Sequence, residues 1–281
     1  IWYEQSPPID DVFYKTSTHF SFFEDGSKAG TNDGVEDSRF VKTSEDVRNY
    51  LMSNHNFNIR RIYSHYTSKD SMFRYWPRQW NSRYAGADSM NFPSELLYEN
   101  GFEWAGNVIH LLDEVNKGVS YILFTGHGSA SFWGCESGSM LVFQNIDYMN
   151  NYDRLPIVFS IACNTGMHDH PGCLMRCFLR KKDGGAVAAF ANTNIAYYDK
   201  YGRVASLLFN AIWPKPGLKM FGVNCDLGNV PELSWITELE HSHQLGAILK
   251  YQQYGMPINI SGGGSGRNPA IWGEYERGVL H

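Results

Sequence analysis

Three short apolar runs, each ending at a turn-forming segment, stand out in the hydrophobic pattern of the chain. They cover residues 119–124, 155–162 and 185–191, and the first two lead directly into the segments TGHGS (125–129) and CNTG (163–166). Continuous apolar runs of this length, bounded by turn residues, are typical of strands that are buried on both faces of a parallel sheet. The pattern therefore predicts at least three buried parallel strands.

Segments with a helical or mixed pattern separate these runs. We predict a helix that starts at Thr43–Asp46 with an N-cap and an acidic first turn, and a strand at Ile59–Tyr63. A 3.6-residue period ends at Gly118, and a further helix is expected at Cys173–Lys181. The period before Gly118 is carried by Trp104, Val108, Leu111, Leu112 and Val115. The long segment Asp70–Pro93 has no period, and long loops of this kind are often functional.

Alternating helices and strands of this kind indicate an α/β fold. The fold class that we predict is a mostly parallel sheet with helices on both faces. In such sheets, chemistry collects at the carboxyl ends of the strands.

His127 and Cys163 follow the first and second apolar runs. Their sequence separation of 36 (163 − 127) is enough for one crossover between neighbouring parallel strands. We therefore expect the imidazole and the thiol to lie at the same edge of the sheet. A thiol becomes a good nucleophile when a positioned imidazole takes its proton, and the imidazole can later protonate a leaving amine.

The residues around this pair suit acyl transfer. Glycines beside His127 let the backbone approach a substrate closely, and the amides of Gly128 and Cys163 are candidate donors to a tetrahedral oxyanion. Taken singly, a cysteine after a strand is more often a core residue and a histidine in a turn more often structural. The occurrence of both at two strand ends favours the catalytic interpretation.

The segments 121–134, 155–166 and 173–193 resemble the catalytic core of the gingipain family of cysteine peptidases, and the resemblance extends more weakly over most of the chain. It implies a caspase- and gingipain-like fold and a cysteine endopeptidase that forms a thioester on Cys163, with His127 as general acid and base. It also implies an oxyanion hole at Gly128 and Cys163. No metal or organic cofactor is implied for the chemistry, although the family suggests structural calcium in the loops.

The segment 22–37 resembles the family's source of two further carboxylates. The resemblance implies that Glu24 orients the histidine, and that Asp37 or, with a one-residue slip, Glu36 lies in the S1 pocket. A buried carboxylate there selects Arg or Lys at P1, because a neutral side chain would leave the charge unpaired. Acidic residues in a loop of Gly, Asn and Asp are also commonly solvated or bound to calcium.

The remaining wall of the P1 pocket is assigned by the same resemblance. It falls on Thr125, Ile161, Ala196 and Tyr198. Tyr198 stands where the arginine-specific members have Trp, which is a departure from the family pattern. The preference for Arg or Lys is therefore a hypothesis motivated by Asp37.

The ends of the chain bear on its domain organisation. Gingipain-like units carry a smaller preceding subdomain and a closing Phe-Gly-Asp-Pro segment, and neither is found in this sequence. We interpret residues 1–281 as a single peptidase subdomain whose exposed face a missing subdomain or a second chain would cover. Two alternatives stay open, a signal-removing transpeptidase of the same family and an inactive peptidase-like binding domain.

The resemblance implies a protein or peptide substrate, and composition argues against two other classes of partner. The formal charge of −5, from 24 basic and 29 acidic residues, argues against nucleic acid, and no apolar run approaches the roughly 18 residues of a membrane span. Five cysteines leave at least one thiol unpaired, and Cys173 and Cys177 are expected to pack on the core face of their helix. An extracellular or cell-envelope location follows from the resemblance alone.

Three other motifs carry less weight. His168-Asp169-His170 lacks a third metal ligand, and Glu240–His243 is expected on the surface of a helix. The glycine-rich segment Ser261–Pro269 lacks the Lys-Ser/Thr ending of a phosphate-binding loop. It is better explained as a mobile loop or as a processing site after Arg267.

Overall fold

The computed structural model describes residues 6–26, 33–65, 76–85, 90–135, 138–196 and 201–220. The strands in these ranges are β1 (Thr16–Phe23), β2 (Asn58–His65), β3 (Tyr121–Thr125), β4 (His127–Ser129), β5 (Phe132–Cys135), β6 (Gly138–Val142), β7 (Ile157–Ile161) and β8 (Ala188–Ala191). The α-helices are α2 (Asp11–Lys15), α3 (Phe40–His55), α4 (Ser82–Ala85), α5 (Val108–Lys117), α6 (Leu174–Arg180) and α7 (Tyr201–Ile212). Short 3-10 helices are η1 (Ser94–Leu96), η2 (Tyr98–Asn100) and η3 (Phe143–Tyr148).

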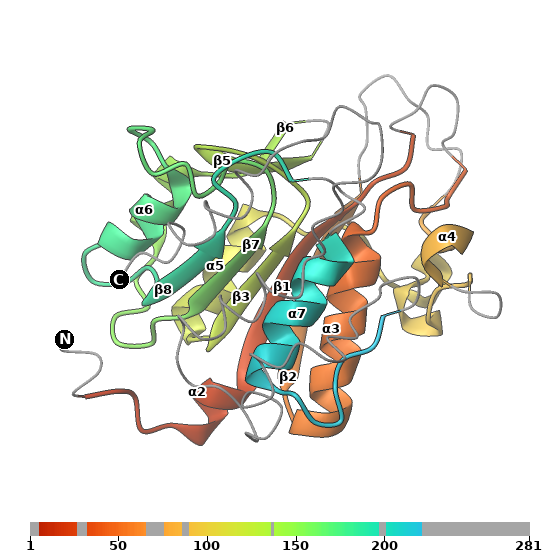
Figure 1. Ribbon diagram of the computed structural model, residues 1–281, viewed down its shortest axis with the longest axis horizontal. Coiled ribbons are helices and arrows are strands. Elements are labelled where there is room, and N and C mark those ends of the chain that lie inside the picture. Colours follow the sequence, from red (N-terminus) through yellow and green to blue (C-terminus); the bar gives the residue numbers. More distant parts are fainter. Residues whose placement is uncertain are drawn as a thin grey trace, which may run out of the picture.

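Five of the strands form one parallel sheet in the order β2-β1-β3-β7-β8 (Figure 1). The three apolar runs of the sequence correspond to β3, β7 and β8, which lie side by side. The predicted parallel sheet is therefore confirmed, and the strands that precede His127 and Cys163 are direct neighbours.

Helices cover both faces of this sheet, as predicted. Tyr121 and Leu123 of β3 pack in one core cluster with residues of α3 and α7, which lie together in front of the sheet in Figure 1. Ile122 and Phe124 pack in a second cluster with residues of α5 and α6. Because side chains alternate between the faces of a strand, this packing buries β3 on both sides, and all five of its residues are buried.

The predicted start of the first long helix at Thr43–Asp46 is wrong by about one turn. Helix α3 begins at Phe40, and its N-cap residue makes no side-chain hydrogen bond to the helix. The carboxylate of Glu36 instead accepts from the amides of Val41 at 2.7 Å and Lys42 at 3.2 Å. A capping group so far before the helix is not visible in the local sequence pattern.

The helix before β3 is also shorter than its apolar period suggested. It begins at Val108, where the Asn107 side chain accepts from two amides of the first turn, and it ends at Gly118 as expected. Trp104 lies outside the helix with a φ of 52° and packs in the core.

A three-stranded antiparallel sheet, β4-β5-β6, was not predicted and occupies the crossover from β3 to β7. Its anchor is Trp133, which is fully buried, stacks on Phe124 with ring centroids 4.5 Å apart, and donates to Ser160 Oγ at 2.8 Å. Since Ser160 belongs to β7, the small sheet is attached to the same strand that leads to Cys163.

An aromatic cluster lies near the carboxyl ends of β1 and β2. It joins Phe23 and Tyr63 to Trp80, Phe92 and Trp104 from the long connection that follows β2. The described parts of that connection therefore contribute to the core beside the end of β1. Its predicted functional role stays a prediction.

Candidate active site

The two predicted catalytic segments meet at one edge of the sheet. Thr125 pairs with Ile161 in the parallel register of β3 and β7, and His127 and Cys163 each follow two residues later. A side chain at Gly128 would place its Cβ 2.9 Å from both the Cys163 carbonyl oxygen and the Ala162 Cβ, which is closer than Cβ atoms approach other heavy atoms in folded proteins. Gly128 is therefore packed directly on the backbone of the Cys163 turn.

The turn after β7 holds Cys163 against the loop that follows β8. Asn164 has a left-handed φ of 60°, which asparagine tolerates better than most residues, and its amide donates to Asn194 O at 3.0 Å. The sulfur of Cys163 accepts from the Ala196 amide at 3.3 Å and lies 3.4 Å from the Ala196 carbonyl oxygen. Cys163 is a partly buried free thiol.

His127 is bonded to the end of β1. Its Nε2 lies 2.7 Å from Oε1 of Glu24, which follows directly after that strand. Because an ionised carboxylate can only accept, this contact assigns the ring proton to Nε2 and leaves Nδ1 as the basic nitrogen. The histidine side chain is 41% exposed whereas that of Glu24 is 4% exposed, so the ring projects from a buried anchor.

Residues at the start of α3 and just before it complete the surroundings of His127. The Phe40 ring meets the imidazole edge-on with centroids 5.2 Å apart, and the Phe40 carbonyl accepts from Thr125 Oγ1 at 2.9 Å. The Ser38 hydroxyl donates to the second carboxylate oxygen of Glu24, and the Asp37 amide donates to the Glu24 carbonyl at 2.8 Å.

The two candidates for the S1 carboxylate have different environments. Glu36 is fully buried and both of its oxygens accept from amides of α3, and burial raises its pKa well above the usual range. Asp37 is partly buried, and its Oδ2 accepts from the Gly26 amide at 2.9 Å. Of the two, Asp37 is the carboxylate that reaches the surface.

The predicted wall positions are only partly described. Thr125 and Ile161 are 0% and 1% exposed, so their side chains lie in the interior of the sheet. Ala196 is partly buried and its backbone touches the Cys163 sulfur. Tyr198 lies outside the described residues. The wall of a P1 pocket therefore stays a prediction, with Ala196 as its best placed described member.

Two further predictions concern the oxyanion hole and bound calcium. Among the residues that the structure describes, no hydrogen-bond acceptor is found for the Cys163 amide, and its role as an oxyanion donor stays a prediction. Within the same residues, no group of three or more His, Cys, Asp or Glu side chains is arranged to hold a metal ion. Structural calcium stays a prediction.

The other predicted motifs can be placed in part. His168 and His170 lie on an exposed turn that Arg176 braces through their carbonyl oxygens. Cys173 and Cys177 pack in the core cluster that contains residues of α5 and α6, as predicted. Glu240–His243 and Ser261–Pro269 lie outside the described residues.

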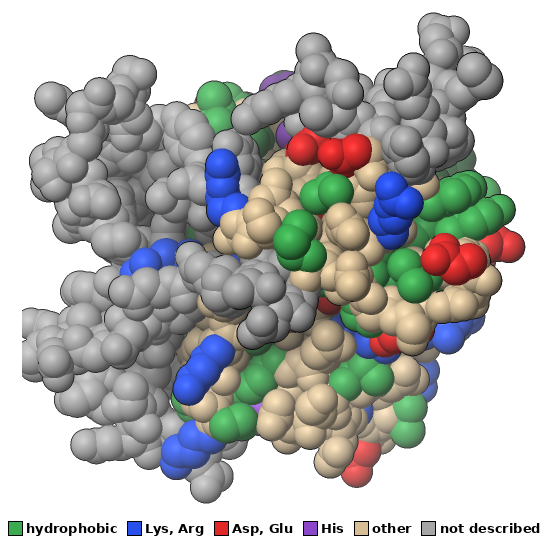
Figure 2. Space-filling view, turned by 90° about the vertical axis from the view of Figure 1, so that its right-hand side faces the viewer, with side chains coloured by type: hydrophobic (Ala, Val, Ile, Leu, Met, Phe, Trp, Pro, Cys, Tyr) green, Lys and Arg blue, Asp and Glu red, His purple; other side chains and the backbone are tan. Residues whose placement is uncertain are grey.

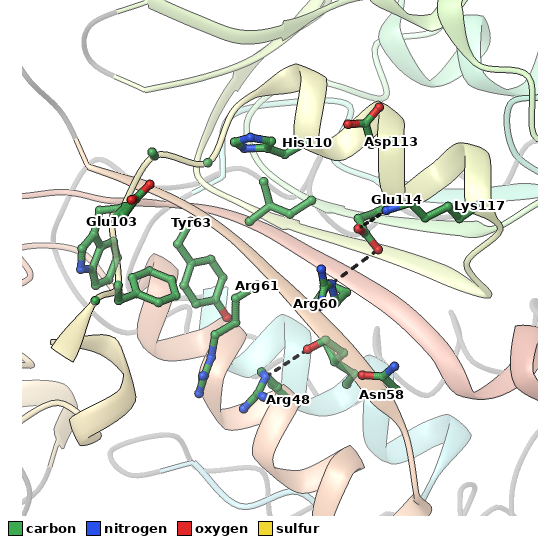
Figure 3. A pocket seen from close by; sticks show the side chains of 17 residues that line it. Arg48, Asn58, Arg60, Arg61, Tyr63, Glu103, His110, Asp113, Glu114 and Lys117 are labelled. Atoms are coloured by element: carbon green, nitrogen blue, oxygen red, sulfur yellow. Dashed lines mark hydrogen bonds and ion pairs between the residues drawn. The ribbon is translucent and has the colours of Figure 1, made fainter. Parts of the chain in front are cut away.

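A groove of about 620 Å³ runs along the outer edge of β2, away from these residues (Figure 3). It is bordered by α5 and the segment 101–106, and Glu114 pairs in it with Arg60 at 3.6 Å and with Lys117 at 2.9 Å. None of the predicted site residues lines this groove.

Among the described residues, no one sign of charge dominates the side that lies at the right in Figure 1. Acidic, basic and apolar side chains are interspersed among the described residues of this face (Figure 2). No helix in the described part of the chain is long and apolar enough to cross a membrane.

A cysteine and a carboxylate-bound histidine at the carboxyl edge of a parallel α/β sheet are the groups that a cysteine peptidase uses. The model of peptidase family C25 matches residues 2–239. The chain therefore belongs to this family, and the resemblance to the gingipains is confirmed.

Curated relatives match a smaller part of the chain. Gingipain R2 and gingipain R1 of Porphyromonas gingivalis are each 33% identical to it over 90 residues, which is 30% of this chain. These matches cover 12% and 9% of the two relatives, respectively.

Among solved structures, the Arg-specific cysteine proteinase gingipain R aligns with a TM-score of 0.54 at 15% identity. The alignment covers 89% of this chain and 43% of that one. At this identity the likeness bears on the fold, and it confirms the predicted gingipain-like architecture.

Sequence reasoning missed Ser38 and Phe40. A single serine or phenylalanine before a helix has no distinctive pattern, and the predicted start of α3 left both residues in a loop. The signal that could have found them is their position one and three residues after Asp37, just beyond the segment 22–37 that the resemblance singled out.

Proposed function

We propose that the chain is the core of a cysteine endopeptidase that acts on protein or peptide substrates. The observation that carries the proposal is the convergence of three segments: His127 bonded to Glu24, and the Gly128 backbone packed on the Cys163 turn. Family membership supports the same chemistry. A location outside the cell or in its envelope is part of the proposal.

The proposed mechanism begins with the transfer of the thiol proton from Cys163 to His127 Nδ1. The thiolate then attacks the scissile carbonyl carbon, and the amides of Gly128 and Cys163 donate to the oxyanion. The imidazolium gives its proton to the leaving amine as the C–N bond breaks, which leaves a thioester on Cys163.

The second half of the reaction releases the acyl group. Water attacks the thioester while His127 takes its proton, and the thiol is restored when the C–S bond breaks. Throughout both halves the Glu24 carboxylate accepts the hydrogen bond from Nε2, so that the ring keeps one orientation while Nδ1 gains and loses a proton.

For substrate selection we propose Asp37 as the P1-recognising carboxylate. It is the member of the Glu36–Asp37 pair that reaches the surface, and the structural relative gingipain R is an Arg-specific cysteine proteinase. A carboxylate in this position favours a guanidinium or ammonium group at P1.

The test uses a peptide library that varies P1, together with Cys163→Ala, His127→Ala and Asp37→Asn. We expect no turnover with Cys163→Ala, a loss of at least about 10²-fold with His127→Ala, and a selective loss of Arg and Lys cleavage with Asp37→Asn. Full activity of Cys163→Ala would refute the endopeptidase. An apolar or small P1 preference in the unmodified protein would refute only the role of Asp37.

The same assay separates the alternatives. Product masses measured with an added amine nucleophile distinguish hydrolysis from transfer to that amine. A chain that binds peptide without turnover, and whose Cys163 reacts with iodoacetamide no faster than its other thiols, would be a binding domain.

A further inference from the structure

We propose that Ser38 is a positioning residue for the reaction, because its hydroxyl holds the carboxylate that orients His127. The inference rests on the proposed function and adds a residue that acts through Glu24. Ser38 itself does not contact the imidazole or the thiol.

The contacts of the Glu24 carboxylate carry this proposal. Its Oε1 is bonded to His127 Nε2 at 2.7 Å, and its Oε2 accepts from the Ser38 hydroxyl. Glu24 and Ser38 are 3% and 5% exposed, respectively, so water has little access to replace either contact of the carboxylate. With both oxygens bonded, the carboxylate plane is fixed, and with it the direction in which the imidazole is held.

Ser38 is itself held by its neighbours in sequence. Before Ser38, the Asp37 amide donates to the Glu24 carbonyl at 2.8 Å, which ties the two segments together through the backbone. After Ser38, the amides of Val41 and Lys42 at the start of α3 donate to the Glu36 carboxylate, which ties the helix back to the residues before Ser38. The serine hydroxyl is therefore presented to Glu24 by a segment anchored at both ends.

Loss of this hydroxyl has a definite chemical consequence. One oxygen of a buried carboxylate is left without its donor, and the terminal torsion of a glutamate side chain is soft enough to let the carboxylate rotate. Rotation moves Oε1 away from Nε2, and the ring then loses the fixed orientation that the proposed proton transfer from Cys163 requires. The effect is expected on the chemical step rather than on substrate binding.

The experiment compares Ser38→Ala, Ser38→Thr and Ser17→Ala with the unmodified protein. Ser17 is a matched control, because it is a fully buried serine on β1 whose hydroxyl bonds Ser120 Oγ at 3.0 Å, at the opposite end of the strand from Glu24. We measure kcat, KM, the midpoint of thermal unfolding, and the rate at which iodoacetamide alkylates Cys163.

We expect Ser38→Ala to lower kcat at least about tenfold, which is the scale of one lost hydrogen bond to a charged group, with KM nearly unchanged. Alkylation of Cys163 should slow in parallel. Ser38→Thr, which keeps the hydroxyl, should recover most of both rates. Ser17→Ala should keep both rates while losing as much thermal stability as Ser38→Ala.

Several outcomes would overturn the inference. Ser38→Ala with rates equal to those of Ser17→Ala would do so, and so would a Ser38→Thr variant that folds but is as slow as Ser38→Ala. If the unmodified protein cleaves no peptide, the proposed function fails, whereas the alkylation rates still decide whether Ser38 controls the reactivity of Cys163.

Discussion

Three consecutive residues at the end of β1 make three different contacts. Glu24 holds His127, Asp25 accepts from the amides of Asp33 and Gly34 at 3.2 and 2.8 Å, and the Gly26 amide donates to Asp37 at 2.9 Å. The end of one strand thus joins the proposed acid–base group to the proposed P1 carboxylate. Changes at Asp25 are expected to reach both of them.

Asp25 gives a prediction on pH. Burial raises its pKa to about 6, so between pH 4 and 6 the folded state binds more protons than the unfolded state. Its contribution to stability therefore falls as the pH rises through this window and is constant above about pH 7. Asp25→Asn cannot titrate, and its free energy of unfolding should lack this component.

The measurement is urea unfolding of both proteins at several pH values from 4 to 8. The difference in free energy of unfolding, unmodified protein minus Asp25→Asn, should decrease from pH 4 to 6 and then level off. A difference that is flat or that increases over this range would contradict the assignment of a raised pKa.

The predicted residues differ in how visible they are in the sequence. His127 and Cys163 could be found because each ends a continuous apolar run and lies in a turn that contains glycine. Glu24 could be found only through the family resemblance, and Ser38 not at all. Its role depends on a partner 14 residues away that only the folded backbone brings near.

At the scale of elements, the strands and helices that carry a clear period were predictable, whereas their boundaries depended on tertiary contacts. β3, β7 and β8 are marked by apolar runs. β3 and β7, which one crossover joins, are neighbours in the sheet as expected. The sheet β4-β5-β6 was missed because its strands are short and rich in Gly and Ser. It becomes regular through the burial of Trp133.

Helix α3 gives the prediction at this scale. Glu36→Ala removes the acceptor of two amides at the start of the helix and should lower the free energy of unfolding by about 1–3 kcal/mol. Glu36→Gln keeps one acceptor and carries no charge to desolvate, so it should lose less. Chemical unfolding monitored by circular dichroism provides the values.

Equal stability of Glu36→Ala and the unmodified protein would show that the helix is capped by other means. If Glu36→Ala folds, Arg cleavage should persist, because Asp37 rather than Glu36 is proposed to face P1. Selective loss of Arg and Lys cleavage in Glu36→Ala would transfer that role to Glu36.

On the scale of the whole molecule, the site depends on the order of the sheet. Strand β1 brings Glu24, β3 brings His127 and β7 brings Cys163, and these strands are consecutive in the order β1-β3-β7. The carboxyl edge of a parallel sheet therefore gathers residues that are far apart in sequence. The chain spans 43% of the length of the structural relative gingipain R, so activity of this part by itself is a proposal.

The most direct test of the central claim is to trap the acyl-enzyme. The protein is mixed with a peptide ester that has Arg at P1, quenched in acid within the first turnover, digested and analysed by mass spectrometry. We predict the acyl mass on the peptide that contains Cys163, with its loss in Cys163→Ala and much slower formation in His127→Ala. Acylation at another residue, or no acyl adduct while the ester is still hydrolysed, would contradict the account.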